Sequence, residues 1–220
     1  MKNIIFTILL TFSLMSYGQF LTKFSLKIGP NISGQKKTPK LFADGGSKLG
    51  LSGTIEPTIL TFGSKKQLDF NTDLSFIQKG GYNYSPIYSY DQWGQLVGTG
   101  AETYPVTITY LSFSPTVKAN FRKVLFVKAG PRMDGFINFK AKDRFSSEKR
   151  TSKDFNVTTF GVTYGLGICT GKNRVKFICE FVGQNDFTNS SYYKITGQTF
   201  RNFSFILNFG VTIILKKQDK

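Results

Sequence analysis

The residues best placed for catalytic chemistry are two aspartates, Asp69 and Asp73, which stand four positions apart. In a strand they would lie on one face and could act as a carboxylate pair in acid–base catalysis. The chain has no histidine, which removes the commonest general base and all Ser-His and Cys-His nucleophile arrangements. We favour a structural interpretation, in which each aspartate pairs with a lysine or arginine, and we expect no enzyme and no cofactor.

A second candidate group is Lys128, Arg132 and Asp134, at spacings of four and two. These side chains could bind an anion, but an internal plug of ion pairs explains them better, because buried charges are tolerated when they are paired. Without histidine, the commonest ligand of transition metals, we expect no metal site.

Aromatic side chains form a third group, Tyr84, Tyr88, Tyr90 and Trp93, within a polar loop predicted at 83–106. Exposed aromatic residues are typical of a surface that binds a partner. Aromatic residues also form girdles at the membrane interfaces of outer-membrane barrels. The sequence leaves both interpretations open.

All these residues belong to segments in which apolar and polar residues alternate. In FSFILNFGVTIIL (203–215) the apolar face is continuous, and Ile206 and Ile214 are exceptions on the polar face. Alternation with a period of two is typical of a β-strand with two different faces. Eight such segments are predicted: 23–33, 48–60, 68–82, 107–121, 124–140, 156–170, 175–185 and 202–215.

The connections between the segments alternate in length. Those at 61–67, 122–123 and 171–174 are short, and the others are long and polar: 34–47, 83–106, 141–155 and 186–201. Short turns at one end and long loops at the other are typical of outer-membrane barrels, whose short turns face the periplasm. The sequence therefore predicts an all-β, eight-stranded antiparallel up-and-down transmembrane β-barrel.

The polar faces of the predicted strands carry six bases and five acids, which is close to neutral. An enclosed interior requires such a balance, because unpaired buried charge is costly. We therefore expect the apolar faces to contact lipid, although a soluble, secreted, lipocalin-like binder is the alternative. The eleven charged residues are Lys27, Glu56, Asp69, Asp73, Lys79, Lys118, Lys128, Arg132, Asp134, Lys176 and Glu180.

Two features test the assignment of faces. Pro30, Pro57, Pro115 and Pro131 interrupt predicted strands, so bulges that shift the inside–outside alternation locally are expected there. The alternation also places Cys169 inside and Cys179 outside. Because a disulfide needs neighbouring Cβ atoms, two free thiols are predicted.

The N-terminus predicts export. Residues 1–18 have a basic start, an apolar middle and small residues before Gln19, as in a signal peptide cleaved after Gly18. The barrel domain is then 19–220, with a net charge of +15, since only Lys2 is lost. A basic exported chain favours contact with membrane lipid and lipopolysaccharide phosphates, and we expect no nucleic-acid binding and a monomer in the outer membrane.

Four stretches carry a resemblance to a known family: KIGPNIS (27–33), SFIQKGGY (75–82), YLSFSPTVKANF (110–121) and VKAGPRMDG (127–135). In these the chain resembles the PorT-like outer-membrane β-barrels of Bacteroidota, which are similar in architecture to OmpA and OmpX. It departs from the family's Tyr-Leu-Glu-Ile-Pro at 110–115 and ends in KKQDK. The family name implies a link to type IX protein secretion.

The predicted barrel is compatible with two kinds of function. In the first, the barrel is filled inside and acts as a structural or interaction protein through its long extracellular loops, with a possible envelope protein as partner. In the second, it is a transport or protein-secretion accessory component. Eight strands enclose a lumen that side chains can fill, which favours the first.

Overall fold

The computed structural model describes residues 21–38, 46–63, 67–121, 124–141, 158–171, 174–189, 191–193 and 198–215. The predicted signal peptide therefore lies outside the described residues. No helix among the described residues is long and apolar enough to span a membrane.

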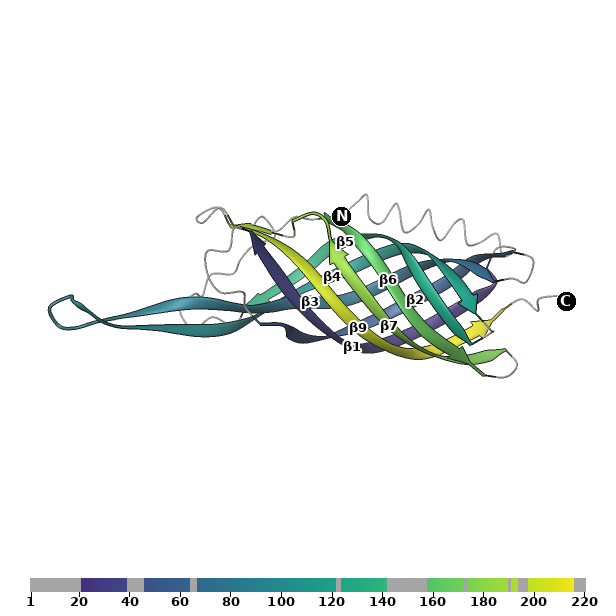
Figure 1. The fold of residues 1–220 in the computed structure, drawn as a ribbon, viewed down its shortest axis with the longest axis horizontal. Helices are drawn as coiled ribbons and strands as arrows, with labels where there is room; N and C mark the ends of the chain where they lie inside the picture. The colour runs from purple at the N-terminus through teal and green to yellow at the C-terminus, as the bar shows by residue number, and fades with distance from the viewer. Residues whose placement is uncertain are drawn as a thin grey trace.

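The described residues form one antiparallel sheet that closes into a barrel (Figure 1). Each long strand pairs with the next along the chain, and β1 also pairs with β9, which closes the ring. The strands are β1 (Lys23–Thr38), β2 (Lys48–Phe62), β3 (Leu68–Tyr90), β4 (Leu96–Phe121), β5 (Leu125–Ala141), β6 (Thr158–Thr170), β7 (Val175–Asp186), β8 (Ser191–Tyr193) and β9 (Gln198–Ile214). The three-residue β8 pairs with β9 alone, so the ring has eight strands, and the predicted fold class is confirmed.

The two ends of the barrel differ as the connection lengths predict. At one end, here called the turn end, lie the short links β2–β3, β4–β5 and β6–β7, and the chain also enters and leaves there, with Leu215 N donating to Thr22 O at 3.0 Å. Gly63, in the first of these links, has a φ of 95°, which L side chains rarely adopt. The opposite end is called the loop end.

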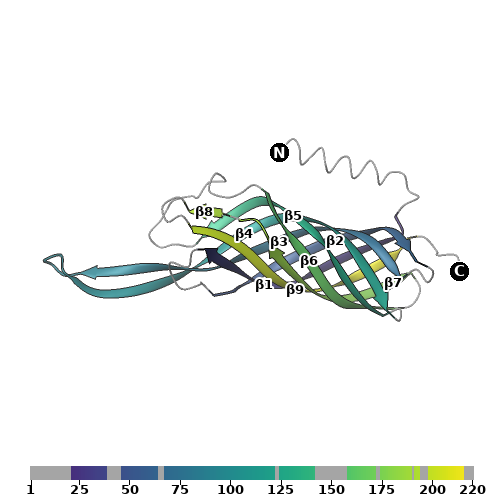
Figure 2. The same ribbon diagram turned by 45° about the horizontal axis from the view of Figure 1, so that its top comes forward.

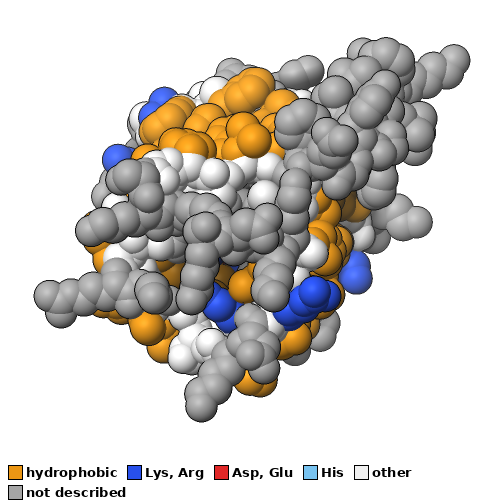
Figure 3. Space-filling model, turned by 90° about the vertical axis from the view of Figure 1, so that its right-hand side faces the viewer, with side chains coloured by type: hydrophobic (Ala, Val, Ile, Leu, Met, Phe, Trp, Pro, Cys, Tyr) orange, Lys and Arg blue, Asp and Glu red, His pale blue; other side chains and the backbone are white. Residues whose placement is uncertain are grey.

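The barrel exposes apolar side chains and buries polar ones. On β9, Phe209 is 49% exposed, whereas its neighbour Asn208 is 2% exposed. The same alternation follows every long strand of the ring, and hydrophobic side chains gather on the outer wall seen from the turn end (Figure 3). A soluble barrel would show the reverse, so the outer wall is suited to lipid.

One of the four prolines lies at the predicted kind of irregularity. Just after Pro57, the register between β2 and β3 shifts between Thr58 and Leu60. Beyond this bulge Leu60 points outward, and Thr61 donates to an interior carboxylate. At the other three prolines, buried and exposed residues alternate without interruption, so no bulge is needed there.

The predicted loop at 83–106 is wrong as a loop. Strand β3 continues to Tyr90 and β4 begins at Leu96, so the two strands form a hairpin closed by residues 91–95. Among the described residues, the segment just before β2 contacts β3 as far as Tyr82: Ser47 opposes Gly81, and Tyr82 N donates to Gly46 O at 2.9 Å. Strand β5 pairs with β4 as far as Val106, and beyond these points the described parts of β3 and β4 pair with each other alone. Residues 82–105, here called the hairpin, extend about 30 Å past the barrel, at about 3.3 Å per residue (Figures 1 and 2).

Candidate functional site

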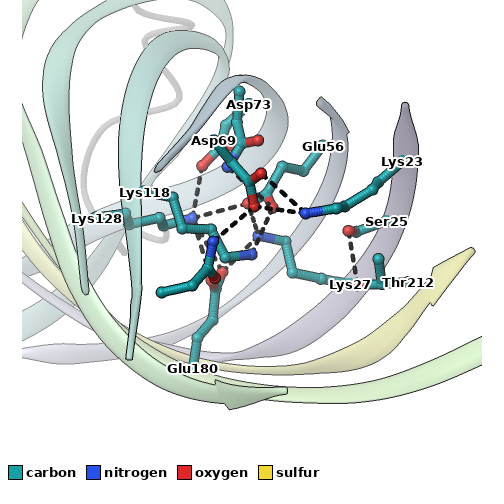
Figure 4. A network of polar contacts seen from close by, with 12 residues as sticks. Lys23, Ser25, Lys27, Glu56, Asp69, Asp73, Lys118, Lys128, Glu180 and Thr212 are labelled. Carbon is teal, nitrogen blue, oxygen red and sulfur yellow. Dashed lines mark hydrogen bonds and ion pairs between the residues drawn. The ribbon is translucent and has the colours of Figure 1, made fainter. Parts of the chain in front are cut away.

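A compact ionic cluster lies in the interior of the barrel, where its side chains point toward one another (Figure 4). It has three lysines and three carboxylates, all buried, so its formal charge is zero. We call it the lower network. Its members are Lys27, Glu56, Asp73, Lys118, Lys128 and Glu180.

Glu56, on β2, is the centre of the lower network. Its carboxylate lies 2.5 Å from Lys27 Nζ and 3.2 Å from the Nζ atoms of both Lys118 and Lys128. Glu180, on the opposite wall, shares two of these lysines, at 2.7 Å from Lys27 and 3.1 Å from Lys128. The network therefore crosses the lumen and joins strands from opposite sides of the ring.

The two aspartates considered for catalysis have separate partners. Asp73 accepts from Lys128 at 2.7 Å within the lower network. Asp69 lies nearer the turn end, where it pairs with Lys23 at 2.8 Å and accepts from Thr61 and Asn120. Each carboxylate is thus paired with a lysine. None of the described contacts joins Asp69 to Asp73, as a catalytic pair would require.

A second ionic cluster lies toward the loop end. Lys79 Nζ is 2.5 Å from Asp134 and 3.6 Å from Asp186. Arg132 pairs with both aspartates, through Nε to Asp134 at 3.0 Å and through Nη2 to Asp186. These four residues, the upper network, are buried and also neutral.

The anion site considered at positions 128, 132 and 134 is not formed. Lys128 belongs to the lower network, whereas Arg132 and Asp134 belong to the upper network. Arg132 already contacts two carboxylates, which leaves its charge neutralised by the protein itself. The arrangement is an ion-pair plug in two layers.

Apolar side chains occupy the interior between and above the two networks. Ile77, Val182 and Ile206 pack together on the inner wall, so the exception noted at Ile206 fills the lumen. Nearer the loop end, Val106 and Ile108 form a second cluster with a buried tyrosine, Tyr110. The interior is therefore less polar than the alternation of charges predicts, and these layers close it further.

Glycines on β6 make room for the long interior side chains. A Cβ atom on Gly161 would lie 2.8 Å from Arg132 Nη2, and one on Gly167 would lie 2.6 Å from Phe126 Cζ and 2.8 Å from Glu180 Cβ. Lys118 Nζ in turn lies 4.1 Å from the centre of the Phe126 ring, a cation–π distance. The glycines on this wall therefore leave the space that the larger side chains in the lumen occupy.

Three further predictions can be placed. Lys176 is on the inner face but half-buried near the turn end, so it lies outside the lower network. Cys169 and Cys179 are free, on opposite faces of a hairpin in which Ile168 opposes Cys179, and the predicted free thiols are confirmed. Among the described residues, no group of three or more acidic or cysteine side chains could hold a metal ion.

Two charged members of the interior, Asp186 and Lys23, are not among the predicted interior residues. The predicted strand ends at 185 and leaves Asp186 in a loop, although the alternation through Glu180, Val182 and Gln184 continues to it. Lys23 stands at the first position of a predicted strand, where no interior role is expected. The signal for both is the period of two: for Asp186 it continues one residue past the predicted end of the strand, and for Lys23 it runs back from Lys27 through Ser25.

The hairpin presents the third candidate group to solvent. Tyr88, Tyr90 and Trp93 are exposed, with Trp93 at 76%, and the side chain of Tyr84 lies outside the described residues. The tip is held by Asp91, whose Oδ1 accepts the backbone N–H groups of Trp93 at 2.9 Å and of residue 95 at 2.8 Å. The aromatic residues are therefore displayed on an ordered turn.

The hairpin also differs in charge from the rest of the chain. From Gly80 to Val117 the only charged residues are Asp91 and Glu102, in a protein with a formal charge of +16. The hairpin is thus acidic and aromatic in a protein that is otherwise basic. The ion pairs of the barrel interior do not account for this composition, because the hairpin lies outside the barrel.

A closed ring with an apolar outer wall and a filled ionic interior defines a small transmembrane β-barrel. No protein-family model and no curated protein matches the sequence. The chain is similar to the solved structure of Neisserial surface protein A, with 11% identity and a TM-score of 0.46 over 87% of this chain and 97% of that one. It is also similar to Ail, the attachment invasion locus protein of Yersinia pestis, in complex with the heparin analogue sucrose octasulfate (12% identity, TM-score 0.41, 88% and 99% covered). A third similar structure is the translocator domain of the autotransporter NalP from Neisseria meningitidis (12%, 0.31, 91% and 92%).

Proposed function

We propose that this protein is a closed outer-membrane barrel that binds a partner through its loop end, with the hairpin as the recognition element. The observation that carries the proposal is the hairpin itself. It extends well past the barrel, and beyond Tyr82 and Tyr104 its described strands pair only with each other. An isolated two-stranded ribbon is at best marginally stable in water, so its retention as a long projection favours a role in binding.

The interior supports a binding role over transport. Two neutral ionic networks and two apolar clusters occupy the lumen of an eight-stranded ring, whereas water-filled channels are found at 16–18 strands. Purified protein in planar bilayers is expected to give no steady, solute-sized conductance. Such conductance from the unmutated barrel would instead favour the transport or secretion alternative.

We infer the location of the protein and its lipid contacts from the outer wall and the N-terminus. The apolar wall would contact outer-membrane lipid, the basic charge would favour lipopolysaccharide phosphates, and residues 1–18 would be removed during export. The four family-like stretches support a place among PorT-like barrels, and the lack of histidine supports a non-enzymatic role. N-terminal sequencing of the mature protein, starting at Gln19, tests the export part.

A shortened hairpin tests the binding role. Replacing residues 84–103 by Asn-Gly would join Asn83 to Tyr104, which already oppose each other, through a favoured two-residue turn. Biotinylated intact and shortened proteins are incubated with outer-membrane and secreted fractions, and captured proteins are quantified by mass spectrometry. We expect heat-modifiable gel mobility in both and partner capture by the intact protein alone. Equal capture by both would refute the proposal.

A further inference from the structure

The hairpin has two free edges that are not equivalent. Along the barrel, the outer edge of β4 pairs with β5 until Val106 meets Ala141. The outer edge of β3 is paired as far as Gly81, which opposes Ser47, and Tyr82, whose N–H donates to Gly46 O at 2.9 Å. Beyond these points, among the described residues, each strand of the hairpin has one row of backbone groups without a strand beside it. Such a row is a template for an added strand.

The prolines show which backbone groups point outward. In an antiparallel ladder, opposed residues alternate between pairs that exchange hydrogen bonds and pairs that do not. Proline has no N–H and fits the second kind, and here Pro86 opposes Ala101 while Pro105 opposes Tyr82. Both pairs belong to the same alternating class. In that class the N–H groups of β4 point away from β3.

The two edges therefore differ in hydrogen-bonding capacity. The free edge of β3 has lost a donor in its middle, at Pro86. The free edge of β4 keeps outward N–H groups at Thr99, Ala101 and Thr103, and it has neither proline nor lysine from Leu96 to Thr103. Natural proteins protect free edges with those very residues, so the β4 edge has been left open to pairing.

The charge of the hairpin indicates what kind of strand would fit. Its only charged residues are two acids, and there is no lysine or arginine between Lys79 and Lys118. The exposed rings of Tyr88 and Trp93 can also attract cations through their faces. A positively charged segment is therefore complementary, and an acidic one is repelled.

We propose that the β4 edge from Leu96 to Thr103 binds an extended, lysine- or arginine-rich peptide segment of a partner protein as an added strand. The segment would lie in line with β5 and continue its pairing with β4 past Ala141. Backbone hydrogen bonds would supply affinity, and the acids and aromatic rings of the hairpin would supply selectivity. This inference rests on the proposed function and names the edge and the chemistry of the partner.

The test uses the full chain in detergent and fluorescein-labelled, end-capped octapeptides in a polarisation assay. The probe is alternating lysine and valine, and the controls are alternating glutamate and valine and a fully N-methylated lysine–valine peptide, which has no backbone donor. The variant Thr99→Pro with Thr103→Pro removes two outward N–H groups. Its matched control, Thr99→Ala with Thr103→Ala, removes the same side chains and keeps the donors.

We expect the lysine–valine peptide to bind at least tenfold more tightly than either control peptide. The double proline variant should lose at least tenfold in affinity, and the double alanine variant should stay within twofold. Equal binding of the N-methylated peptide to the unmutated protein would overturn strand addition even if the proline variant misfolds. No binding of the lysine–valine peptide would overturn the proposal too.

The outcome separates this inference from the proposed function. If shortening the hairpin abolishes partner capture but the double proline variant captures normally, the hairpin binds by another surface and only this inference fails. If the shortened protein still captures every partner, the proposed function fails first.

Discussion

The barrel interior and the hairpin place charge in opposite ways. Inside, the two networks hold five bases and five acids in buried, neutral clusters that link strands across the lumen. The hairpin has two acids, no base and exposed aromatic residues, and beyond Tyr82 and Tyr104 its described strands pair only with each other. Charge in the interior therefore serves stability, whereas the side chains of the hairpin remain available for the recognition role proposed above.

The most damaging change should remove the centre of the lower network. In Glu56→Gln, three buried lysines share two carboxylates, and breaking buried ion pairs in this way costs about 3–5 kcal/mol. The midpoint of urea unfolding in lipid vesicles measures the loss. The hairpin acid Asp91→Asn is the matched control and should change stability by less than about 1 kcal/mol. Similar losses of stability for the two variants would contradict the view that charge stabilises the interior but not the hairpin.

The next largest effect should come from the lipid-facing wall. Phe209→Arg places a charge on an exposed position of β9 and should cost about 2–4 kcal/mol if the residue lies near the bilayer midplane. The neighbouring inward position, Asn208→Arg, should respond to packing and to Glu180, whose Oε1 accepts from Asn208 at 3.0 Å. Protein that stays soluble without detergent and lacks heat-modifiable mobility would contradict the lipid-facing assignment.

A smaller loss of stability should follow from adding a side chain at a glycine on β6. Gly167→Val pushes a side chain against Phe126 and Glu180, and overpacking of this kind costs about 1–3 kcal/mol. The same change in the hairpin, Gly98→Val, meets its nearest atom, Ser89 Cβ, at an ordinary 3.7 Å and should change stability by less than about 0.5 kcal/mol. The unfolding midpoints of the two variants compare the cost of an added side chain in the packed interior and in the open hairpin.

The sequence predicted the interior better than the hairpin for a physical reason. In the ring, one face meets lipid and the other is enclosed, so a period of two identifies the inward residues, such as Lys27 and Glu180. The sequence could not predict which inward residues form ion pairs. Lys27 on β1 and Glu180 on β7 are 153 positions apart in the chain, and only the closure of the ring brings them together. None of the described side chains of the hairpin is buried, so its composition resembled a loop. The signal of a strand that the prediction of a loop missed is the alternate spacing of tyrosines such as Tyr88 and Tyr90, a period of two.

The smallest effect on stability should come from the tip of the hairpin, and it is the most informative about function. Trp93 is 76% exposed, and its backbone N–H, not its ring, holds the turn through Asp91. Trp93→Ala should therefore change the free energy of unfolding by less than about 0.5 kcal/mol, as for other exposed positions. Its affinity for the captured partner should fall about tenfold, since exposed tryptophans that bind partners dominate interface energies. A loss of stability above about 1 kcal/mol would mean that the ring packs on the barrel, and the separation between a region for stability and a region for recognition would then fail.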